Sequence, residues 1–320
     1  MSTGSADTAL QPDVLANSEQ MIAVGSKSFA AAARLFSRQT RADAVMLYAW
    51  CRHADDVVDG QELGHKTSLV QDEDAAERLE RLTSETKAAL EGRRSDDPVF
   101  EALRQVVQRN QIPHRHPLEL LKGFEMDVGG RVYASEEDTL DYCYHVAGVV
   151  GVMMAMIMGV RDEAVLDRAS DLGLGFQLTN IARDVIDDAR AGRVYLPAEW
   201  LQATGIEKID PDSPEQRKAL HTLALRLLDQ AEPYYRSAYA GLPALPFRSA
   251  WAVAAARRVY RDIGNQLRKK GPQAWDGRVS TSKSRKLVLL GFALKDVIVT
   301  RFASTADGVE RTDLFQRPRG

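Results

Sequence analysis

The chain has 320 residues, of which 44% are hydrophobic and 27% are charged, and its 45 acidic residues nearly balance its 42 basic ones. This length allows one large or two ordinary domains and suffices to enclose an apolar cavity. A net charge of −3 argues against a protein that mainly coats nucleic acid, because such proteins carry a strong basic excess. The two cysteines, Cys51 and Cys143, exclude a disulfide framework and indicate a reducing cytoplasm, and without a C-x-x-C pair we expect no Cys/His zinc site.

Apolar residues recur every three to four positions along most of the chain, whereas convincing runs of alternating β-branched residues are missing. The pattern predicts a single all-α domain over residues 19–302, after a flexible segment over 1–18 and before a loose, polar tail over 303–320. Helices are expected over residues 21–36, 42–58, 75–90, 99–107, 119–128, 139–160, 164–188, 213–240, 248–270 and 282–302.

The segment YAWCRHADDVVDG, residues 48–60, is the first with a chemical pattern. Tyr48, Arg52, Asp55 and Asp59 are spaced so that they share one face of a helix. Carboxylates four residues apart repel each other on an exposed helix, so this arrangement suggests a compensating cation.

The longest uncharged apolar run, residues 146–160, is 15 residues long. A helix needs ~20 such residues to span a bilayer, so this run predicts a buried helix. Its three glycines and two alanines would give it a thin face that another helix or a ligand can approach closely.

The segment QLTNIARDVIDDARAGRVYLP, residues 177–197, carries a second polar stripe. Gln177, Asn180, Asp184 and Asp188 again share one helical face, and each side chain offers an oxygen atom. Mg²⁺ prefers such ligands, taking few carboxylates and keeping waters or phosphate oxygens. A lone D-x-x-x-D arises by chance about once in a chain of this length and usually lies on a solvated helix face. Two such stripes, each with Arg or Asn partners, instead predict a cage for magnesium and a diphosphate.

These two segments, with GSKSF (residues 25–29) and YCYHVAGVVG (residues 142–151), resemble the squalene/phytoene synthase family over residues 21–302. The phrases YAWCRHADDVVD and GRVYLPAEWL are most similar to its bacterial phytoene synthases. The resemblance implies an all-α isoprenoid-synthase bundle with a central cavity. It also implies head-to-head condensation of two geranylgeranyl diphosphates, through prephytoene diphosphate, to phytoene, with Mg²⁺ or Mn²⁺ and without NADPH. The apolar run then becomes the expected wall for a C20 chain.

Carried over by position, the resemblance implies a set of site residues. Those implied in catalysis are Asp55, Asp59, Asp184, Asp188, Tyr48 and Arg52. Those implied as metal ligands are Asp55, Asp59, Asn180, Asp184 and Asp188. Those implied in substrate binding are Ser26, Lys27, Ser28, Phe29, Tyr142, Gln177, Asn180, Arg183, Arg193, Tyr195 and Tyr260.

Two alternatives share the fold class. Asp56 makes the first motif read D-D-x-x-D, as in head-to-tail prenyltransferases and terpene cyclases, but the second motif, DVIDD, does not fit those enzymes. The same fold acting on farnesyl diphosphate would instead make dehydrosqualene or squalene. A non-catalytic helical assembly factor is the other alternative, and it should have lost the four aspartates.

The C-terminal third is rich in Lys and Arg. A solvated helix face explains this pattern, and so does a membrane-surface patch, because the implied substrate and product are lipids. We therefore expect prenyl diphosphates but no nucleic acid as partners, and a cytoplasmic protein in peripheral contact with the inner face of the membrane. The sequence predicts no oligomeric state.

Overall fold

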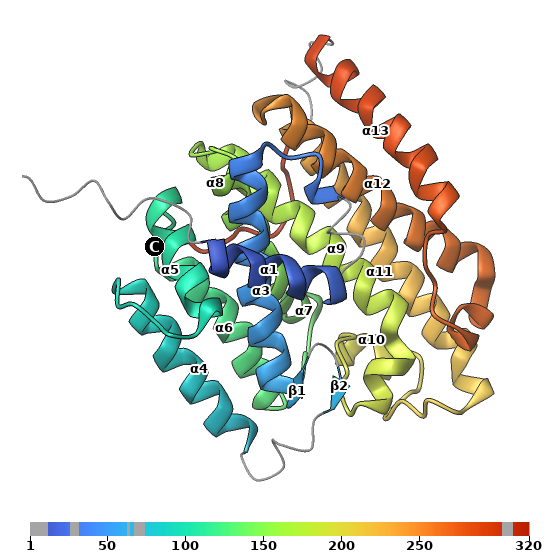
Figure 1. Ribbon diagram of the computed structural model, residues 1–320. Coiled ribbons are helices and arrows are strands. Elements are labelled where there is room, and N and C mark those ends of the chain that lie inside the picture. The colour runs from blue at the N-terminus through green and yellow to red at the C-terminus, as the bar shows by residue number, and fades with distance from the viewer. Residues whose placement is uncertain (1–11, 26–31, 63–64, 67–73, 303–309, 320) are drawn as a thin grey trace, which may run out of the picture. The chain divides into compact units, whose positions relative to one another are not determined.

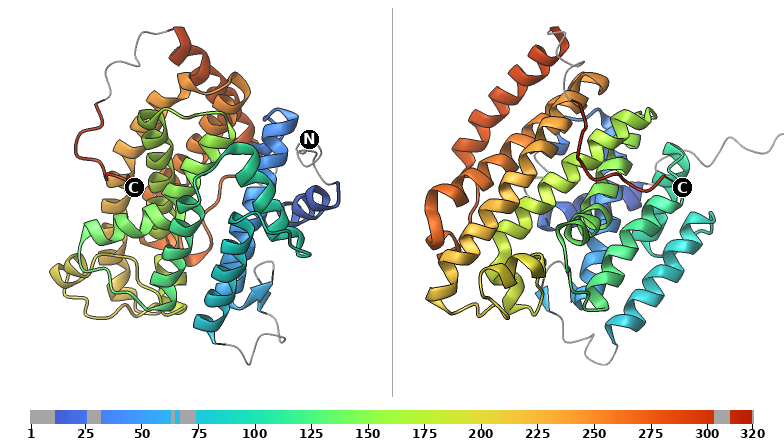
Figure 2. Two further views of the ribbon diagram at one scale, coloured as in Figure 1. Left: turned by 90° about the vertical axis from the view of Figure 1, so that its left-hand side faces the viewer. Right: turned by 180° about the vertical axis from the view of Figure 1, so that it is seen from behind.

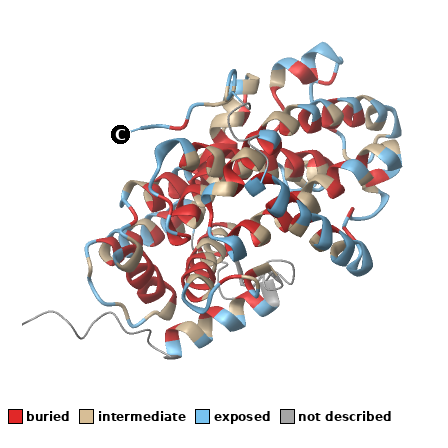
Figure 3. Ribbon diagram, turned by 90° about the horizontal axis from the view of Figure 1, so that it is seen from above, coloured by how far each residue is buried: buried red, intermediate tan, exposed pale blue. Residues whose placement is uncertain are grey.

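The structure is a computed structural model that describes residues 12–25, 32–62, 65–66, 74–302 and 310–319 (Figure 1). By internal contacts the chain divides into two compact units. The first contains residues 1–128 and 153–159, and the second contains residues 129–152 and 160–320. Both are helical, as predicted, and within them buried and exposed positions alternate around single helices (Figure 3). The single domain expected over residues 19–302 and the cavity between its helices stay predictions.

The first unit is built around a 22-residue helix. Its described elements are α1 (Pro12–Gly25), α3 (Arg38–Asp59), the two-residue strands β1 (Gln61–Glu62) and β2 (His65–Lys66), α4 (Ala75–Leu90), α5 (Pro98–Asn110) and α6 (Arg115–Val128). The helix α3 packs against α1, α4, α5 and α6, and its side chain Trp50 is fully buried. Helix α1 begins at Pro12, inside the segment predicted to be flexible, and the short antiparallel hairpin was not predicted.

The ends of α3 are fixed by local chemistry. At its start the Ser37 side chain accepts a hydrogen bond from the Thr40 amide. At its end Gly60 adopts the left-handed conformation, with φ 63°, that terminates many helices. Arg78 on α4 donates to the carbonyl oxygens of Val57 at 2.8 Å and Val58 at 3.1 Å. A cation thus binds carbonyl oxygens at the C-terminal end of the helix, and this holds the end of α3 that carries Asp59.

The second unit is dominated by α9 (Glu163–Arg190) and α11 (Pro214–Gly241), two 28-residue helices that run side by side (Figure 1). Its other elements are α7 (Glu136–Cys143), a π-helical turn (Tyr144–Gly148), the start of α8 (Val149–Ile157), α10 (Ala198–Ala203), α12 (Phe247–Lys270), α13 (Lys283–Phe302) and the 3₁₀ turns Leu242–Ala244 and Gly271–Asp276. Helices α12 and α13 also lie side by side (Figure 2). Helix α10 was not predicted.

Two glycines of the apolar run, Gly148 and Gly151, pack against α9. A Cβ atom on Gly151 would lie 2.3 Å from the carbonyl oxygen of Ala169, and one on Gly173 would lie 2.3 Å from that of Ala147. The two backbones are therefore in direct contact on this side of the run, and the expectation that the run lines a substrate chain stays a prediction. By length and composition residues 136–157 could cross a membrane, but 61% of the most apolar window is buried. The run is a helix of the protein core, which confirms the prediction of a buried helix.

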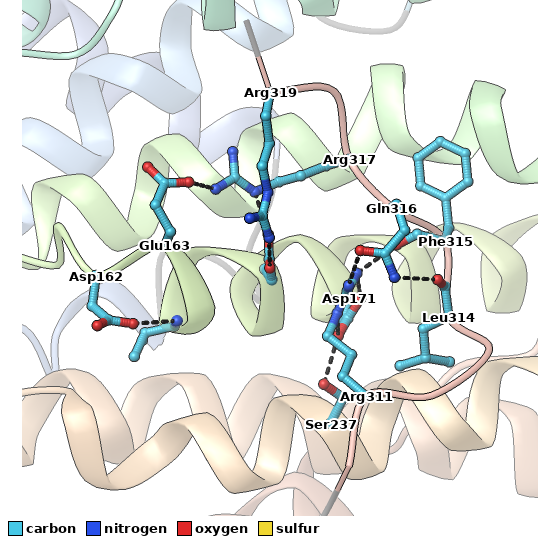
Figure 4. A network of polar contacts seen from close by, with 12 residues as sticks. Asp162, Glu163, Asp171, Ser237, Arg311, Leu314, Phe315, Gln316, Arg317 and Arg319 are labelled. Atoms are coloured by element: carbon cyan, nitrogen blue, oxygen red, sulfur yellow. Dashed lines mark hydrogen bonds and ion pairs between the residues drawn. The ribbon is translucent and has the colours of Figure 1, made fainter.

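Residues 310–319 are not the loose tail that the sequence suggested. Arg311 donates to both carboxylate oxygens of Asp171 at 2.8 Å, and Ser237 donates to the same carboxylate at 2.5 Å (Figure 4). Arg317, whose side chain is fully buried, binds Asp167 at 2.7 Å and also pairs with Glu163. The segment is anchored because its arginines, distant in the sequence, pair with carboxylates that α9 holds buried.

Candidate active site

The first stripe lies on α3 in the first unit. Tyr48, Arg52, Asp55 and Asp59 are all half-buried positions on one face of this helix. Arg52 donates to Asp55 at 3.0 Å, so it is the compensating cation that the spacing suggested. The Asp55 side chain keeps 47% of its surface exposed and remains open to a ligand.

Asp56 has a different role from its neighbours. Its side chain is only 6% exposed and accepts two hydrogen bonds from Arg52, at 2.6 and 3.2 Å. This bidentate pair fixes the guanidinium beside Asp55. The additional aspartate that makes the motif read D-D-x-x-D therefore orients Arg52 from within the unit.

The second stripe lies on α9 in the second unit. Gln177, Asn180, Asp184 and Asp188 occupy half-buried positions along one face, while Ile181 and Ile186 on other faces are buried. Asn180 donates to the Gln177 side chain at 3.3 Å. Arg183 pairs with Asp184, its Nε donating at 2.7 Å, and the Arg183 side chain is 13% exposed.

Asp188 is the most perturbed carboxyl of this stripe. Its pKa is raised to about 7, mainly by burial and then by the negative charges of Asp184 and Asp187, while the positive charges of Arg193 and Arg183 oppose the rise. Arg193 is held nearby because its amide donates to the Asp188 carbonyl at 2.8 Å, after Gly192 ends the helix in a left-handed turn. Two carboxylates that repel each other at a half-buried face attract a cation or a proton.

Aromatic rings line the same face. Tyr260 on α12 stacks on Phe176 of α9, with ring centroids 4.0 Å apart. Burial raises the pKa of the Tyr260 hydroxyl, while Arg183 and a hydrogen bond with Asn180 lower it. Phe176 was missed in the sequence analysis, although it precedes Gln177 and lies one helical turn from Asn180, a spacing that could have identified it.

Tyr142 and Tyr195 lie in a second aromatic cluster. Their rings stack at 4.6 Å, and Tyr133 packs against both. Thr139 on α7 donates to the Tyr195 carbonyl at 2.9 Å, which anchors the loop that follows α9. A small cavity in this unit is lined by Asp188, Arg193 and Tyr195 among others, and therefore connects the loop to the acidic stripe.

Four predicted residues, Ser26, Lys27, Ser28 and Phe29, lie outside the described residues. That the aspartates of α3 and α9 face each other and together bind magnesium and a diphosphate stays a prediction.

The chemistry of α9 fits a divalent cation. The Asn180 Oδ1 atom is buried and accepts no hydrogen bond. A buried polar oxygen in this state is costly unless something binds it. Among the described residues no three His, Cys, Asp or Glu side chains form a ready metal centre. A pair of aspartates with an amide oxygen suits Mg²⁺, which completes its shell with water and phosphate oxygens.

A model of the squalene/phytoene synthase family matches residues 22–285. The chain belongs to the squalene/phytoene synthase family. Within this family it is 53% identical to a 15-cis-phytoene synthase from Paracoccus sp., over 96% of this chain and 98% of the relative. It is 50% identical to a 15-cis-phytoene synthase from Pantoea ananas, over 96% and 99% of the two chains. The crystal structure of a dehydrosqualene synthase in complex with a ligand matches 88% of this chain and 96% of that one, with a TM-score of 0.78 and 29% identity.

Proposed function

We propose that this enzyme is a 15-cis-phytoene synthase that transfers prenyl groups in the first committed step of carotenoid biosynthesis. The observation that carries the proposal is the identity of 50% or more, over nearly the full length of both chains, to enzymes named for that activity. The two intact aspartate stripes support it, because a non-catalytic relative has no reason to keep four aspartates and two adjacent arginines on half-buried helix faces.

The reaction joins two geranylgeranyl diphosphates. The first loses diphosphate, and its C1 bonds to the double bond of the second, with loss of a proton, to close the cyclopropane of prephytoene diphosphate. Loss of the second diphosphate, rearrangement and loss of a second proton then give phytoene. Each step that generates a cation needs a stabilised leaving group and protection from water.

The residues divide these tasks. Asp55 and Asp59 on α3, with Asn180, Asp184 and Asp188 on α9, would hold Mg²⁺ or Mn²⁺. When bound, the metal supplies Lewis-acid neutralisation of the diphosphate charge. The guanidinium groups of Arg52, Arg183 and Arg193 can bind phosphate oxygens, since each already lies beside a carboxylate of a stripe or interacts with it electrostatically.

The aromatic rings would stabilise the carbocation and shield it from water. The faces of Tyr48, Phe176 and Tyr260 can stabilise a nearby cation by roughly 0.5–2 kcal/mol each. Their hydrocarbon surface also keeps water from it. Tyr142 and Tyr195 would bound the site where the prenyl chain lies, and Gln177 would bind the substrate beside Asn180.

The location of the enzyme follows from the same chemistry. We expect it in the cytoplasm, in peripheral contact with the membrane, because its product would be a C40 hydrocarbon that water does not dissolve. We expect no requirement for NADPH.

The test is product analysis with purified protein, Mg²⁺ and either geranylgeranyl or farnesyl diphosphate, with and without NADPH. We expect phytoene from the C20 substrate, in the same amount with and without NADPH. Formation of no hydrocarbon from either substrate would refute the proposal.

A second candidate is a dehydrosqualene synthase, favoured by the structural similarity to such an enzyme at 29% identity. It predicts a C30 product from farnesyl diphosphate and little from the C20 substrate, so the same assay separates the two.

A further inference from the structure

The outward face of α13 is apolar. Leu287, Val288, Phe292, Ile298, Val299 and Phe302 are between 40% and 87% exposed. They recur at helical spacing along one side, while Leu289, Ala293 and Val297 on the other side are buried in the contact with α12. Most amphipathic helices of soluble proteins point polar residues outward, whereas α13 carries apolar residues on its outward face as well as on its buried face.

This concentration is specific to α13. Of the nine large hydrophobic side chains exposed among the described residues, six belong to this helix. A seventh, Phe247, lies under the guanidinium of Arg301 at 5.4 Å and extends the surface from the end of α13. We call these seven residues the α13 patch. Single exposed apolar residues are ordinary, but a contiguous group marks an interaction surface.

The charge around the α13 patch is positive. Helix α13 carries Lys283, Arg285, Lys286, Lys295 and Arg301. Its one acidic residue, Asp296, is buried, and Arg258 binds it with two hydrogen bonds at 2.5 and 2.6 Å. Arg285 pairs with Asp262 at 2.9 Å. The exposed charge that α13 presents beside its apolar residues is therefore basic.

We propose that the α13 patch docks onto an anionic lipid bilayer, with its apolar side chains in the interface and its lysines at the headgroups. Basic residues beside Phe and Leu on one helix suit this partner, because lipid supplies both apolar contact and negative charge. Docking of a second copy through the same face would bring Lys283 and Lys295 of two chains toward like charges. The purpose that we give to docking rests on the proposed function: it would allow access to a lipid substrate and release of a hydrocarbon. The evidence for the docking surface itself does not depend on that function.

Helix α13 would lie on the bilayer and not cross it. Its 20 residues include six charged side chains, and its inner face is buried against α12. A spanning helix would have to leave those contacts and carry the charges into hydrocarbon.

The test is co-sedimentation of the full chain with vesicles of phosphatidylcholine alone, or with about a third phosphatidylglycerol, at low salt. We expect wild type to bind the anionic vesicles, with affinity that falls as salt is added. Leu287→Ser with Phe302→Ser, which alters the two most exposed side chains of the patch, should weaken binding at least about tenfold. Lys283→Glu with Lys295→Glu should weaken it to a similar extent. The matched control is Val132→Ser, which alters an equally exposed apolar residue outside α13 and should bind as wild type.

The proposal is overturned if wild type does not sediment with anionic vesicles, or if neither pair of substitutions changes binding. A wild-type dimer that the Leu287→Ser and Phe302→Ser pair dissociates, without vesicle binding, would also overturn it and assign the patch to self-association. An assay of activity on detergent-dispersed substrate tests the proposed function independently of membrane docking. Wild type that binds vesicles but forms no hydrocarbon would contradict the activity and leave the docking surface standing.

Discussion

Arg52 connects two carboxylates with different surroundings. Its guanidinium binds the buried Asp56 through two nitrogens and reaches the half-exposed Asp55 with the third. The Arg52 guanidinium can therefore exchange its hydrogen bond with Asp55 for one with a phosphate oxygen, because its two hydrogen bonds with Asp56 keep it in place. Among the residues that the structure describes, Arg183 on α9 hydrogen-bonds to the carboxylate of Asp184 and to no second carboxylate.

Substitution of Arg52 separates anchoring from catalysis. Arg52→Ala should lower the free energy of unfolding by about 1–3 kcal/mol, because it leaves the Asp56 carboxylate buried without its cation. Arg52→Ala with Asp56→Asn should recover most of that stability in urea melts. Turnover should stay low in both variants, and recovery of turnover in the double variant would show that Arg52 only balances Asp56.

At the scale of elements, helical spacing is a local property, so the sequence suffices to predict both stripes and most helix bounds. Helix α4 spans Ala75–Leu90, as predicted. Contacts between distant segments are different. Arg311 and Asp171 are 140 residues apart, and nothing near either one identifies its partner. From the sequence, the glycines of the apolar run are compatible with close approach of either a ligand or another helix. The structure shows a helix there, because the backbone at Gly173 contacts the backbone at Ala147.

Because α9 and the apolar run are in close contact, a single methyl group added at their interface should lower the stability of the protein. Gly173→Ala should destabilise the protein by about 1–3 kcal/mol, because the new Cβ atom collides with backbone that cannot rotate away. Gly291→Ala on α13 is the matched control. No atom lies within 4 Å of its added Cβ, so it should raise stability by about 0.5–1 kcal/mol in thermal melts. Equal effects of the two changes would contradict this packing.

The C-terminal segment should be needed to stabilise α9. Arg311→Ala should cost about 3–5 kcal/mol, because Asp171 is fully buried and loses its cation. Arg319→Ala should cost less than about 1 kcal/mol, because that arginine is 58% exposed and Arg317 still binds Asp167. Chemical denaturation measures both. If Arg311→Ala with Asp171→Asn is no more stable than Arg311→Ala alone, the buried charge is not the cause.

At the scale of the whole molecule, a net charge of −3 averages over surfaces of opposite sign. Aspartates line half-buried faces of α3 and α9, and lysines surround the apolar face of α13. Under the two proposals each surface would serve a different part of a prenyl diphosphate reaction: the acidic stripes would bind the metal and its diphosphate, and the α13 patch would bind the lipid. Sequence composition alone hides this division because the charges nearly cancel.

The most direct test of the account is hydrocarbon and diphosphate release from geranylgeranyl diphosphate and Mg²⁺ by wild type, Asp55→Asn, Asp184→Asn and Asp187→Asn. Asp187 is adjacent to the second stripe but points to solvent, with 69% of its side chain exposed, so it is the matched control. We expect phytoene from wild type and Asp187→Asn, and a loss of at least about a hundredfold in the other two, since each factor of ten is about 1.4 kcal/mol of transition-state stabilisation. Folded Asp55→Asn and Asp184→Asn proteins that turn over at the wild-type rate would contradict it.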